Sequence, residues 1–327
     1  MKEIIVKKTD EISTAEWTEI VIGFNEEFKR EKTAADLVTY YSANFYGYSY
    51  HGISKNEQGI ITGFSSVMPV KYTDATGTEF LTGLSLSTFV KKDFRSDIFI
   101  FNDIYKALRT ACANDGFKVI LGVPNKNSFK YLTKLLGFSF LYNLPYYVLP
   151  IRIANILQLN WLKPFGAVYL LLVWLYVKWM GLVSLIYNPA EKKSNFNILY
   201  TAETYSLRFN KAYTTITDQK YKFTYRLYDE KNIKTAYLFH FTQNGKRSFR
   251  ALSKAVNYIM ANEKADLVAF VGKLDLNQLL FLKLPEKKQP QPLPLTIDVL
   301  VPKTDNSYAA FKKPANWNFG LMNLDVR

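Results

Sequence analysis

The residues that bear most directly on chemistry lie in the short stretch Asn244-Gly-Lys-Arg-Ser248. This stretch combines a glycine with two cations, and it separates an expected strand from a helix whose apolar positions begin at Phe249. A helix N-terminus favours an anion, and Lys or Arg side chains add charge-assisted hydrogen bonds. Gly245, Lys246, Arg247 and Ser248 therefore form a candidate anion site. A surface turn with solvated charges is the alternative interpretation.

Other kinds of site find little support in the composition. The chain has one cysteine, Cys112, and two histidines, His51 and His240, which provide no zinc-ligand spacing, so we expect no metal site. Neither a P-loop nor a Gly-x-Gly-x-x-Gly motif occurs. Cys112 falls on the apolar face of an expected helix, which favours a buried thiol over a nucleophile. A single cysteine also fits a reducing, cytoplasmic compartment.

The first part of the chain alternates between helical and strand patterns. Apolar residues at helical spacing predict a helix over 16–30, and Thr33 can cap a second helix. Two helices are thus expected before the first strands, which we place at 47–52, 59–72 and 81–90. A loop that contains Lys91, Lys92 and Arg95 then leads into a helix over 102–114.

The stretch 119–138 contains a strand, a loop and a helix in close succession. Residues 119–123 suit a short buried strand, Pro124 ends it, and Asn125 or Asn127 can cap a helix that begins near Ser128. Gly137 is expected to close this helix in the left-handed conformation. The inward face of the helix is expected to carry four apolar residues: Phe129, Leu132, Leu135 and Leu136.

This stretch resembles a known family. Val-Pro-Asn-x-x-Ser from Val123, followed by Lys-x-x-Gly-Phe from Lys134, is similar to the second half of the GNAT (N-acetyltransferase) fold. In that fold strand five splays from strand four, and an acyl-CoA tail enters between them. The stretches 207–213 and 316–325 resemble parts of two-lobed GNAT-like proteins that are often associated with bacterial surface-glycan synthesis.

The resemblance implies an acyl-CoA site in the first half of the chain. Arg95 matches the Arg or Gln that opens the pyrophosphate loop of the family, but Ser96-Asp97-Ile98-Phe99-Ile100 stands in place of its usual two glycines. Without glycine the backbone approaches a phosphate less closely, and Asp97 places a negative charge near the expected anion. The implied cofactor-binding residues are Thr88, Val90, Arg95, Ser96, Asn125 and Ser128.

The resemblance identifies one candidate general acid and no general base. Family members often place a proton-donating Tyr in the helix after strand five, and Tyr131 lies one residue from that position. A surface Tyr that lies over lysine stems is the alternative. Glu79 and Asp93 flank the strand that would carry a base, whereas the strand itself has only Ser and Thr. Hydroxyls such as those of Ser85 and Ser87 can order a water that carries a proton.

Residues 165–187 form a long apolar segment with a single charge, Lys178. The segment is long enough to cross a bilayer, which needs about 20 apolar residues. It also fits a helix buried between soluble domains, or a helix docked in the plane of a membrane surface. We prefer the dock, because Trp161, Trp174 and Trp179 suit a headgroup interface and Lys178 can extend to water.

The part of the chain after Asn188 repeats the strand and helix order of residues 47–148. Strands are expected at 220–228, 235–241, 266–271 and 295–301, with helices from 248 and over 274–284. The predicted fold is therefore α+β, with two GNAT-like lobes, each a mixed, mostly antiparallel sheet flanked by helices. The predicted domains are a GNAT-like domain over 1–150, a hydrophobic helical connector over 151–195 and a degenerate GNAT-like domain over 196–327.

Three functions fit these observations. The first is an N-acyltransferase that uses acetyl-CoA or another acyl-CoA to acylate a small amine, such as an amino sugar or surface-glycan precursor. The second is a catalytically degenerate GNAT pair that acts as a scaffold at the membrane face. The third is a FemAB-like aminoacyl transferase, although no coiled-coil arm appears between 188 and 265. The net charge of +14 implies an anionic partner, but we do not expect it to be nucleic acid. The expected location is the cytoplasm, peripherally at the inner membrane face.

Overall fold

The computed structural model describes residues 3–97, 99–189, 194–230, 232–275 and 279–323, without the side chains of residues 160, 162 and 163. The chain forms two compact units. Unit 1 comprises residues 1–143, 194–208 and 293–317, and unit 2 comprises residues 144–193, 209–292 and 318–327. Each unit thus draws on separate stretches of the chain, in contrast to the predicted succession of 1–150, 151–195 and 196–327.

Unit 1 is built on a mixed sheet with the strand order β1-β2-β3-β4-β5-β14-β6, and β8 pairs with β3 off this path. Its strands are β1 (Glu3–Lys8), β2 (Tyr50–Lys55), β3 (Ile61–Thr73), β4 (Glu79–Val90), β5 (Val119–Gly122), β6 (Ser139–Asn143), β8 (Asn197–Ile198) and β14 (Pro294–Val299). Only β4 and β5 run parallel, and all other neighbours are antiparallel.

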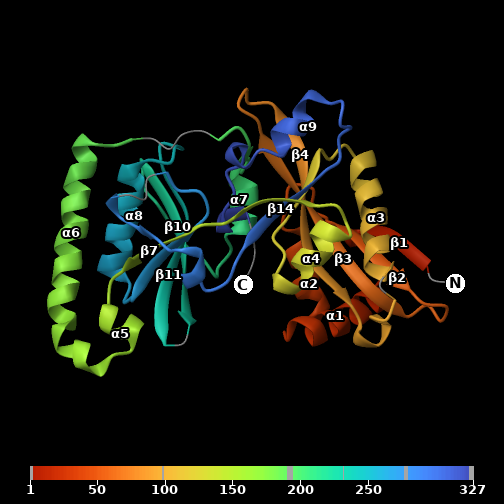
Figure 1. The fold of residues 1–327 in the computed structure, drawn as a ribbon, viewed down its shortest axis with the longest axis horizontal. Helices are drawn as coiled ribbons and strands as arrows, with labels where there is room; N and C mark the ends of the chain where they lie inside the picture. The colour runs from red at the N-terminus through yellow and green to blue at the C-terminus, as the bar shows by residue number, and fades with distance from the viewer. Residues whose placement is uncertain (1–2, 98, 190–193, 231, 276–278, 324–327) are drawn as a thin grey trace. The chain divides into compact units, whose positions relative to one another are not determined.

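Helices pack against both faces of this sheet (Figure 1). The helices of unit 1 are α1 (Thr14–Phe28), α2 (Ala34–Ser42), α3 (Phe99–Asn114), α4 (Lys126–Lys134), α7 (Ala202–Arg208) and α9 (Asn306–Phe311). One core contains Trp17, Ile20 and Leu37 from α1 and α2, and the other contains Ile104 and Leu108 from α3. Both sets follow helical spacing, which explains why the sequence pattern located these helices.

Unit 2 contains a second sheet with the strand order β13-β7-β12-β11-β10-β9. Its strands are β7 (Tyr146–Pro150), β9 (Thr214–Thr217), β10 (Tyr221–Glu230), β11 (Ile233–Gln243), β12 (Leu267–Val271) and β13 (Leu282–Lys283), and its helices are α5 (Ile153–Leu157), α6 (Gly166–Ile186) and α8 (Phe249–Asn262). Leu252, Val256 and Ile259 of α8 pack into the core of this unit, and buried residues of α6 join the same cluster.

The two sheets exchange strands along the chain. β7 follows β6 directly, yet it pairs with β12 and β13 in the sheet of unit 2. β14 comes after the strands of unit 2, yet it lies between β5 and β6 in the sheet of unit 1. The predicted strand near 295–301 is therefore present, but it completes the first lobe and not the second.

Several local predictions were wrong. β1 precedes the two helices that we expected to come first. The predicted helix over 274–284 contains β13, while its residues 276–278 lie outside the described residues. On α4 only Leu132 is fully buried, and Leu135 is 43% exposed because the helix is short and ends at Lys134. The predicted connector helix, α6, packs within unit 2.

Candidate functional site

The parallel strands β4 and β5 separate after a short paired stretch. They pair at Thr82, Gly83 and Leu84 of β4, and β5 ends at Gly122. β4 continues to Val90 and pairs with β3 alone on its other edge. The backbone edge of β4 beyond Leu84 therefore has no strand partner in β5, as expected if an extended ligand takes that place.

A β-bulge interrupts β4 in this unpaired part. The register of the β3–β4 pair shifts between Phe64 and Ser66 of β3. As a result, Ser87 and Thr88 of β4 lie opposite the single residue Ser65. Ser87 has a positive φ of 38°, and the hydroxyls of Ser65 and Thr88 lie 2.7 Å apart. A bulge leaves one residue out of the ladder and redirects its backbone groups. Backbone N–H groups placed in this way can stabilise a developing oxyanion.

A buried polar cluster, which no sequence pattern indicates, lies behind the bulge. The ring nitrogens of His51 lie 2.9 Å from the Thr9 hydroxyl and 2.8 Å from the Ser66 hydroxyl. Burial lowers the pKa of His51 to about 3, so its ring is neutral at physiological pH. The cluster is a candidate for holding the backbone of β3 in place where it faces the bulge.

Tyr41 of α2 extends this cluster. Its hydroxyl is fully buried near the Ser87 and Ser66 hydroxyls, but it forms no hydrogen bond of regular geometry with the described residues. Burial raises its pKa to about 12, against smaller lowering effects of the Ser87 and Ser66 hydroxyls. The members of this cluster, Thr9, Tyr41, His51 and Ser66, are far apart in sequence and alternate with ordinary core positions. No sequence pattern therefore indicates that they lie together.

Asn125 and Ser128, which were predicted to bind the cofactor, form the N-terminal cap of α4. The Asn125 side chain accepts hydrogen bonds from the N–H groups of Asn127 and Ser128, each at 2.9 Å, and the Ser128 hydroxyl lies 3.0 Å from the same oxygen. Asn125 is thus the N-cap, as the sequence predicted. Tyr131, further along the helix, is 55% exposed.

The loop after β4 holds its predicted cation in internal contacts. Arg95 donates from Nε to the Val90 carbonyl at 3.0 Å, and its guanidinium pairs with Glu27 of α1. Ser96 is exposed beside it. An exposed ion pair of this kind is worth only about 0–1 kcal/mol, so an incoming phosphate can compete with Glu27 for the guanidinium.

Asp97 occupies the start of the next helix. Its carboxylate accepts the N–H of Phe99, the first residue of α3, at 2.9 Å. A carboxylate at this position satisfies a helix N–H group that would otherwise be available to an external anion. The expected pyrophosphate position at α3 therefore already contains a negative charge of the protein itself.

Unit 2 repeats the arrangement of separating parallel strands. β11 and β12 pair at Thr235, Ala236 and Tyr237, after which β11 continues to Gln243. The segment Asn318–Asn323 lies beside the separated ends, and together they line a cavity of about 20 Å³. A cavity of that size holds about one water molecule. The chain itself thus fills the second lobe at the place that corresponds to the unpaired edge of β4.

Two glycines allow this segment to approach β12 closely. Gly272 and Gly320 form a bridge, and Gly272 has a φ of 130°. A Cβ atom on Gly272 would meet the Cα atom of Gly320 at 2.6 Å, and one on Gly320 would meet the Val271 carbonyl oxygen at 2.7 Å. Neither position can accept a larger side chain without displacing the segment 318–323 from the strand.

The predicted second-lobe anion site takes part in the same internal packing. Asn244 and Gly245 form the tip of a tight turn, with positive φ at both residues, and Lys246 pairs with Gln243 to close it. Ser248 caps α8 by accepting the N–H of Ala251. Arg247 donates to the Lys273 carbonyl at 3.1 Å and to Asn318 at 3.3 Å, and it stacks on Phe241 and Phe270. The contact with Asn318 links Arg247 to the segment 318–323, and the other contacts hold it against β11, β12 and Lys273.

The chain was compared with known proteins. No protein-family model and no curated protein sequence matches it. Among solved structures, a GCN5-related N-acetyltransferase from Kribbella flavida is similar at 9% identity, with 91% of this chain and 71% of that chain covered and a TM-score of 0.60. The chain has a GNAT fold. The predicted fold class, with two GNAT-like lobes, is thereby confirmed.

Two further solved structures are similar over most of this chain. A probable N-acyltransferase from Enterococcus faecalis V583 is 12% identical over 91% of this chain and 72% of its own, with a TM-score of 0.59. The N-myristoyltransferase of Saccharomyces cerevisiae, with bound myristoyl-CoA, is 10% identical over 90% of this chain and 82% of its own, with a TM-score of 0.50. At these identities the likeness concerns the fold alone.

Proposed function

We propose that this protein is an acyl-CoA-dependent N-acyltransferase whose acyl-CoA site lies in unit 1, along the unpaired edge of β4. The observation that carries the proposal is the separation of β4 from β5 together with the bulge at Ser87 and Thr88. The bound myristoyl-CoA in the yeast structure supports an acyl-CoA as co-substrate. The second lobe is the weaker candidate, because residues 318–323 fill the corresponding place.

The residues of unit 1 provide part of the chemistry of acyl transfer. In that reaction the amine nitrogen attacks the thioester carbonyl, the C–S bond breaks, and the leaving thiolate accepts a proton. The backbone at the bulge is the candidate donor to the carbonyl oxygen. Tyr131 is the candidate proton donor to the thiolate, and a water held by Ser85 or Ser87 is the candidate acceptor of the amine proton.

The proposed substrates are acetyl-CoA and a small amine, with an amino sugar or surface-glycan precursor as the candidate acceptor. Because acyl-CoA is a cytoplasmic metabolite, the proposed location is the cytoplasm. Calorimetric titration with CoA, acetyl-CoA and longer acyl-CoAs tests the first step. Saturable binding to at least one of them is the expected result, and failure to bind any would reject the proposal.

A catalytically inactive scaffold is the second candidate, because Asp97 occupies the start of α3 and the described residues around the bulge include no evident general base. The two candidates differ in turnover. Release of free CoA from a bound acyl-CoA in the presence of amines, followed with a thiol reagent, supports the enzyme. Binding without release against a broad panel of amines and amino sugars supports the scaffold.

The charge on Asp97 gives a specific prediction. Asp97→Asn keeps an oxygen that can cap α3 but removes the negative charge, and one charge near a surface phosphate changes binding by about 1 kcal/mol. CoA should therefore bind about fivefold more tightly to this variant in calorimetry. Asp218→Asn is the control, because Asp218 also accepts two backbone N–H groups at an exposed turn, in unit 2. Equal affinity of both variants would place the phosphates elsewhere.

A further inference from the structure

The helix α6 has two faces that differ in burial. Val173, Val177, Met180 and Ser184 are at most 9% exposed and belong to the side that packs within unit 2. The opposite side carries large apolar residues that are about half exposed or more: Val168, Leu171, Leu175, Trp179, Leu182 and Ile186. A soluble monomer rarely exposes a contiguous apolar surface of this extent without a binding role.

The inner face of α6 is fixed to the rest of unit 2. α6 runs beside α8 (Figure 1), and the Asn257 side chain of α8 donates to the Val177 carbonyl at 3.3 Å. Tyr169 donates to the Pro150 carbonyl, and Tyr176 donates to the Leu279 carbonyl. By length and composition alone, α6 is able to cross a membrane. Crossing would remove it from α8 and leave these groups without partners, so the contacts favour a helix that stays on the surface of its unit.

The charges around α6 indicate which partner covers its outer face. Residues 151–190 contain three basic residues, Arg152, Lys163 and Lys178, and neither Asp nor Glu, and of these Arg152 pairs with Asp266 and donates to the Lys264 carbonyl. The Lys178 ammonium lies 5.6 Å from the ring centre of Trp174, so its stem runs along the apolar surface. Three exposed tryptophans, Trp161, Trp174 and Trp179, lie on α6 or just before it, and tryptophan favours the boundary between headgroups and acyl chains. An anionic lipid surface matches this combination of apolar, aromatic and basic groups.

We infer that α6 docks the protein in the plane of an anionic bilayer, with its outer face among the acyl chains and its inner face on α8. This inference is independent of the proposed enzymatic function. Docking would hold unit 2 at the surface while the chain remains a peripheral protein. The favourable terms are the burial of apolar side chains and the attraction of the basic groups to acidic headgroups.

Vesicle binding by the full chain tests the inference. The protein should co-sediment with vesicles of equimolar phosphatidylcholine and phosphatidylglycerol, more weakly with phosphatidylcholine alone, and less at high salt. The double variant Leu171→Glu and Leu182→Glu should bind roughly tenfold more weakly or worse, because both charges would enter the apolar layer. Both positions are exposed, so the variant should fold. The control is Ile22→Glu with Ile60→Glu, which makes the same charge change at exposed positions of unit 1 and should bind like the original protein.

Tryptophan fluorescence separates docking from the alternatives. Trp17 and Trp317 are buried, so a blue shift on vesicle addition reports on the three exposed tryptophans near α6. Quenching should be stronger with lipids brominated near the headgroup than with lipids brominated near the chain end. Stronger quenching by lipids brominated near the chain end would indicate that α6 crosses the bilayer. If the Leu171→Glu and Leu182→Glu variant sedimented with vesicles as well as the original protein, the outer face of α6 would not be the membrane contact. If the original protein did not bind vesicles but formed a dimer that the double variant does not form, the outer face of α6 would be an interface with a second copy of the chain. Each of these three results would overturn the inference.

Discussion

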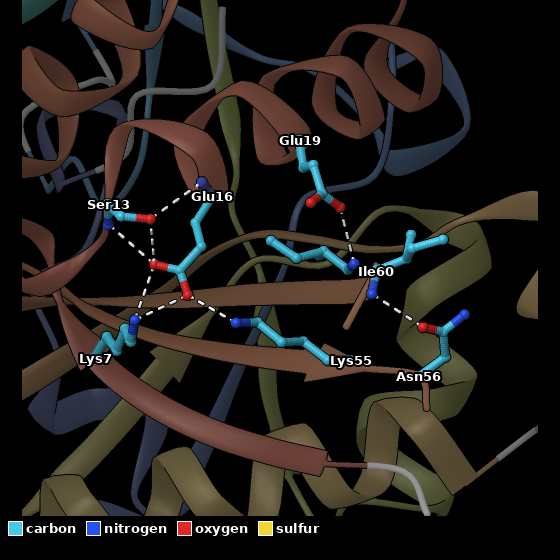
Figure 2. Close-up of polar contacts among 8 residues, drawn as sticks. Lys7, Ser13, Glu16, Glu19, Lys55, Asn56 and Ile60 are labelled. Atoms are coloured by element: carbon cyan, nitrogen blue, oxygen red, sulfur yellow. Dashed lines mark hydrogen bonds and ion pairs between the residues drawn. The ribbon is translucent and has the colours of Figure 1, made fainter. Parts of the chain in front are cut away.

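Replacing Glu16 by Gln is expected to lower the free energy of unfolding by about 3 kcal/mol at neutral pH. Figure 2 shows the reason: Glu16 of α1 points between Lys7 of β1 and Lys55 of β2 and also contacts Ser13. The carboxylate lies 2.8 Å from the Lys7 ammonium and 2.9 Å from that of Lys55, and its side chain is only 10% exposed. The variant would leave two ammonium groups facing a neutral amide. Urea unfolding of both proteins measures the difference.

The same contact predicts how the difference depends on pH. Burial raises the pKa of Glu16, but hydrogen bonds from Lys55, Lys7 and Ser13 outweigh this effect and lower the pKa to about 2 from an ordinary value of 4.5. A carboxyl group with a lowered pKa stabilises the fold above its unfolded pKa, and this contribution is lost as the carboxyl is protonated. The stability gap between the original protein and the Glu16→Gln variant should therefore be constant above about pH 4.5 and shrink towards pH 2.

Glu79→Gln is the matched control for this experiment. Glu79 lies 3.2 Å from Lys71, but their side chains are 53% and 41% exposed. Exposed pairs contribute about 0–1 kcal/mol, so this variant should unfold almost like the original protein. Two results would show that the contact of Glu16 with Lys7 and Lys55 does not anchor α1 to the sheet. One is an equal loss of stability in both variants, and the other is a stability difference for Glu16→Gln that does not depend on pH.

Reversing the charge of Arg95 is expected to have the largest effect on ligand binding. Arg95→Glu should weaken CoA binding about 10- to 100-fold, because it removes a charge-assisted hydrogen-bond donor and adds an anion beside Asp97. If the protein is an acyltransferase, KM for acyl-CoA should rise while kcat changes little, since the pyrophosphate does not react. Glu27, which loses its partner, is exposed and should tolerate the change.

Arg250→Glu is the control for Arg95, since it reverses a charge on α8 in unit 2. The Arg250→Glu variant should bind CoA with the same affinity as the original protein. A loss confined to Arg250→Glu, or equal losses in both variants, would contradict the assignment of Arg95 to phosphate binding. Thermal unfolding of each variant checks that both remain folded.

The sequence predicted features that are encoded locally. Asn125 caps α4, Gly137 has a positive φ of 77°, and Cys112 is fully buried on α3, all as expected. In each case a side chain or a backbone conformation within a few residues decides the outcome. The amphipathic spacing of α1, α3 and α8 is local in the same sense.

The sequence could not predict which strands pair with one another. The sequence predicts a strand at β14 but not at β7, and nothing within either stretch indicates that β7 joins the sheet of unit 2 and β14 the sheet of unit 1, because the choice depends on contacts across the whole chain. For the same reason the cluster of Tyr41, His51 and Ser66 and the close approach of Gly272 to Gly320 became visible only in the structure. Conversely, Asn125 and Ser128 resembled ligand-binding residues, and the structure shows their present role as a cap.

Hydrogen–deuterium exchange with and without acetyl-CoA locates the acyl-CoA site, because it reports on both lobes at once. We expect slower exchange on ligand addition in peptides that cover 84–90 and 119–131, since the ligand would pair with the unpaired edge of β4 and cover the start of α4. Peptides that cover 238–243 and 267–271 should not change, because residues 318–323 already fill that place. Protection confined to unit 2, or acetyl-CoA binding without protection at β4, would contradict an acyl-CoA site along β4.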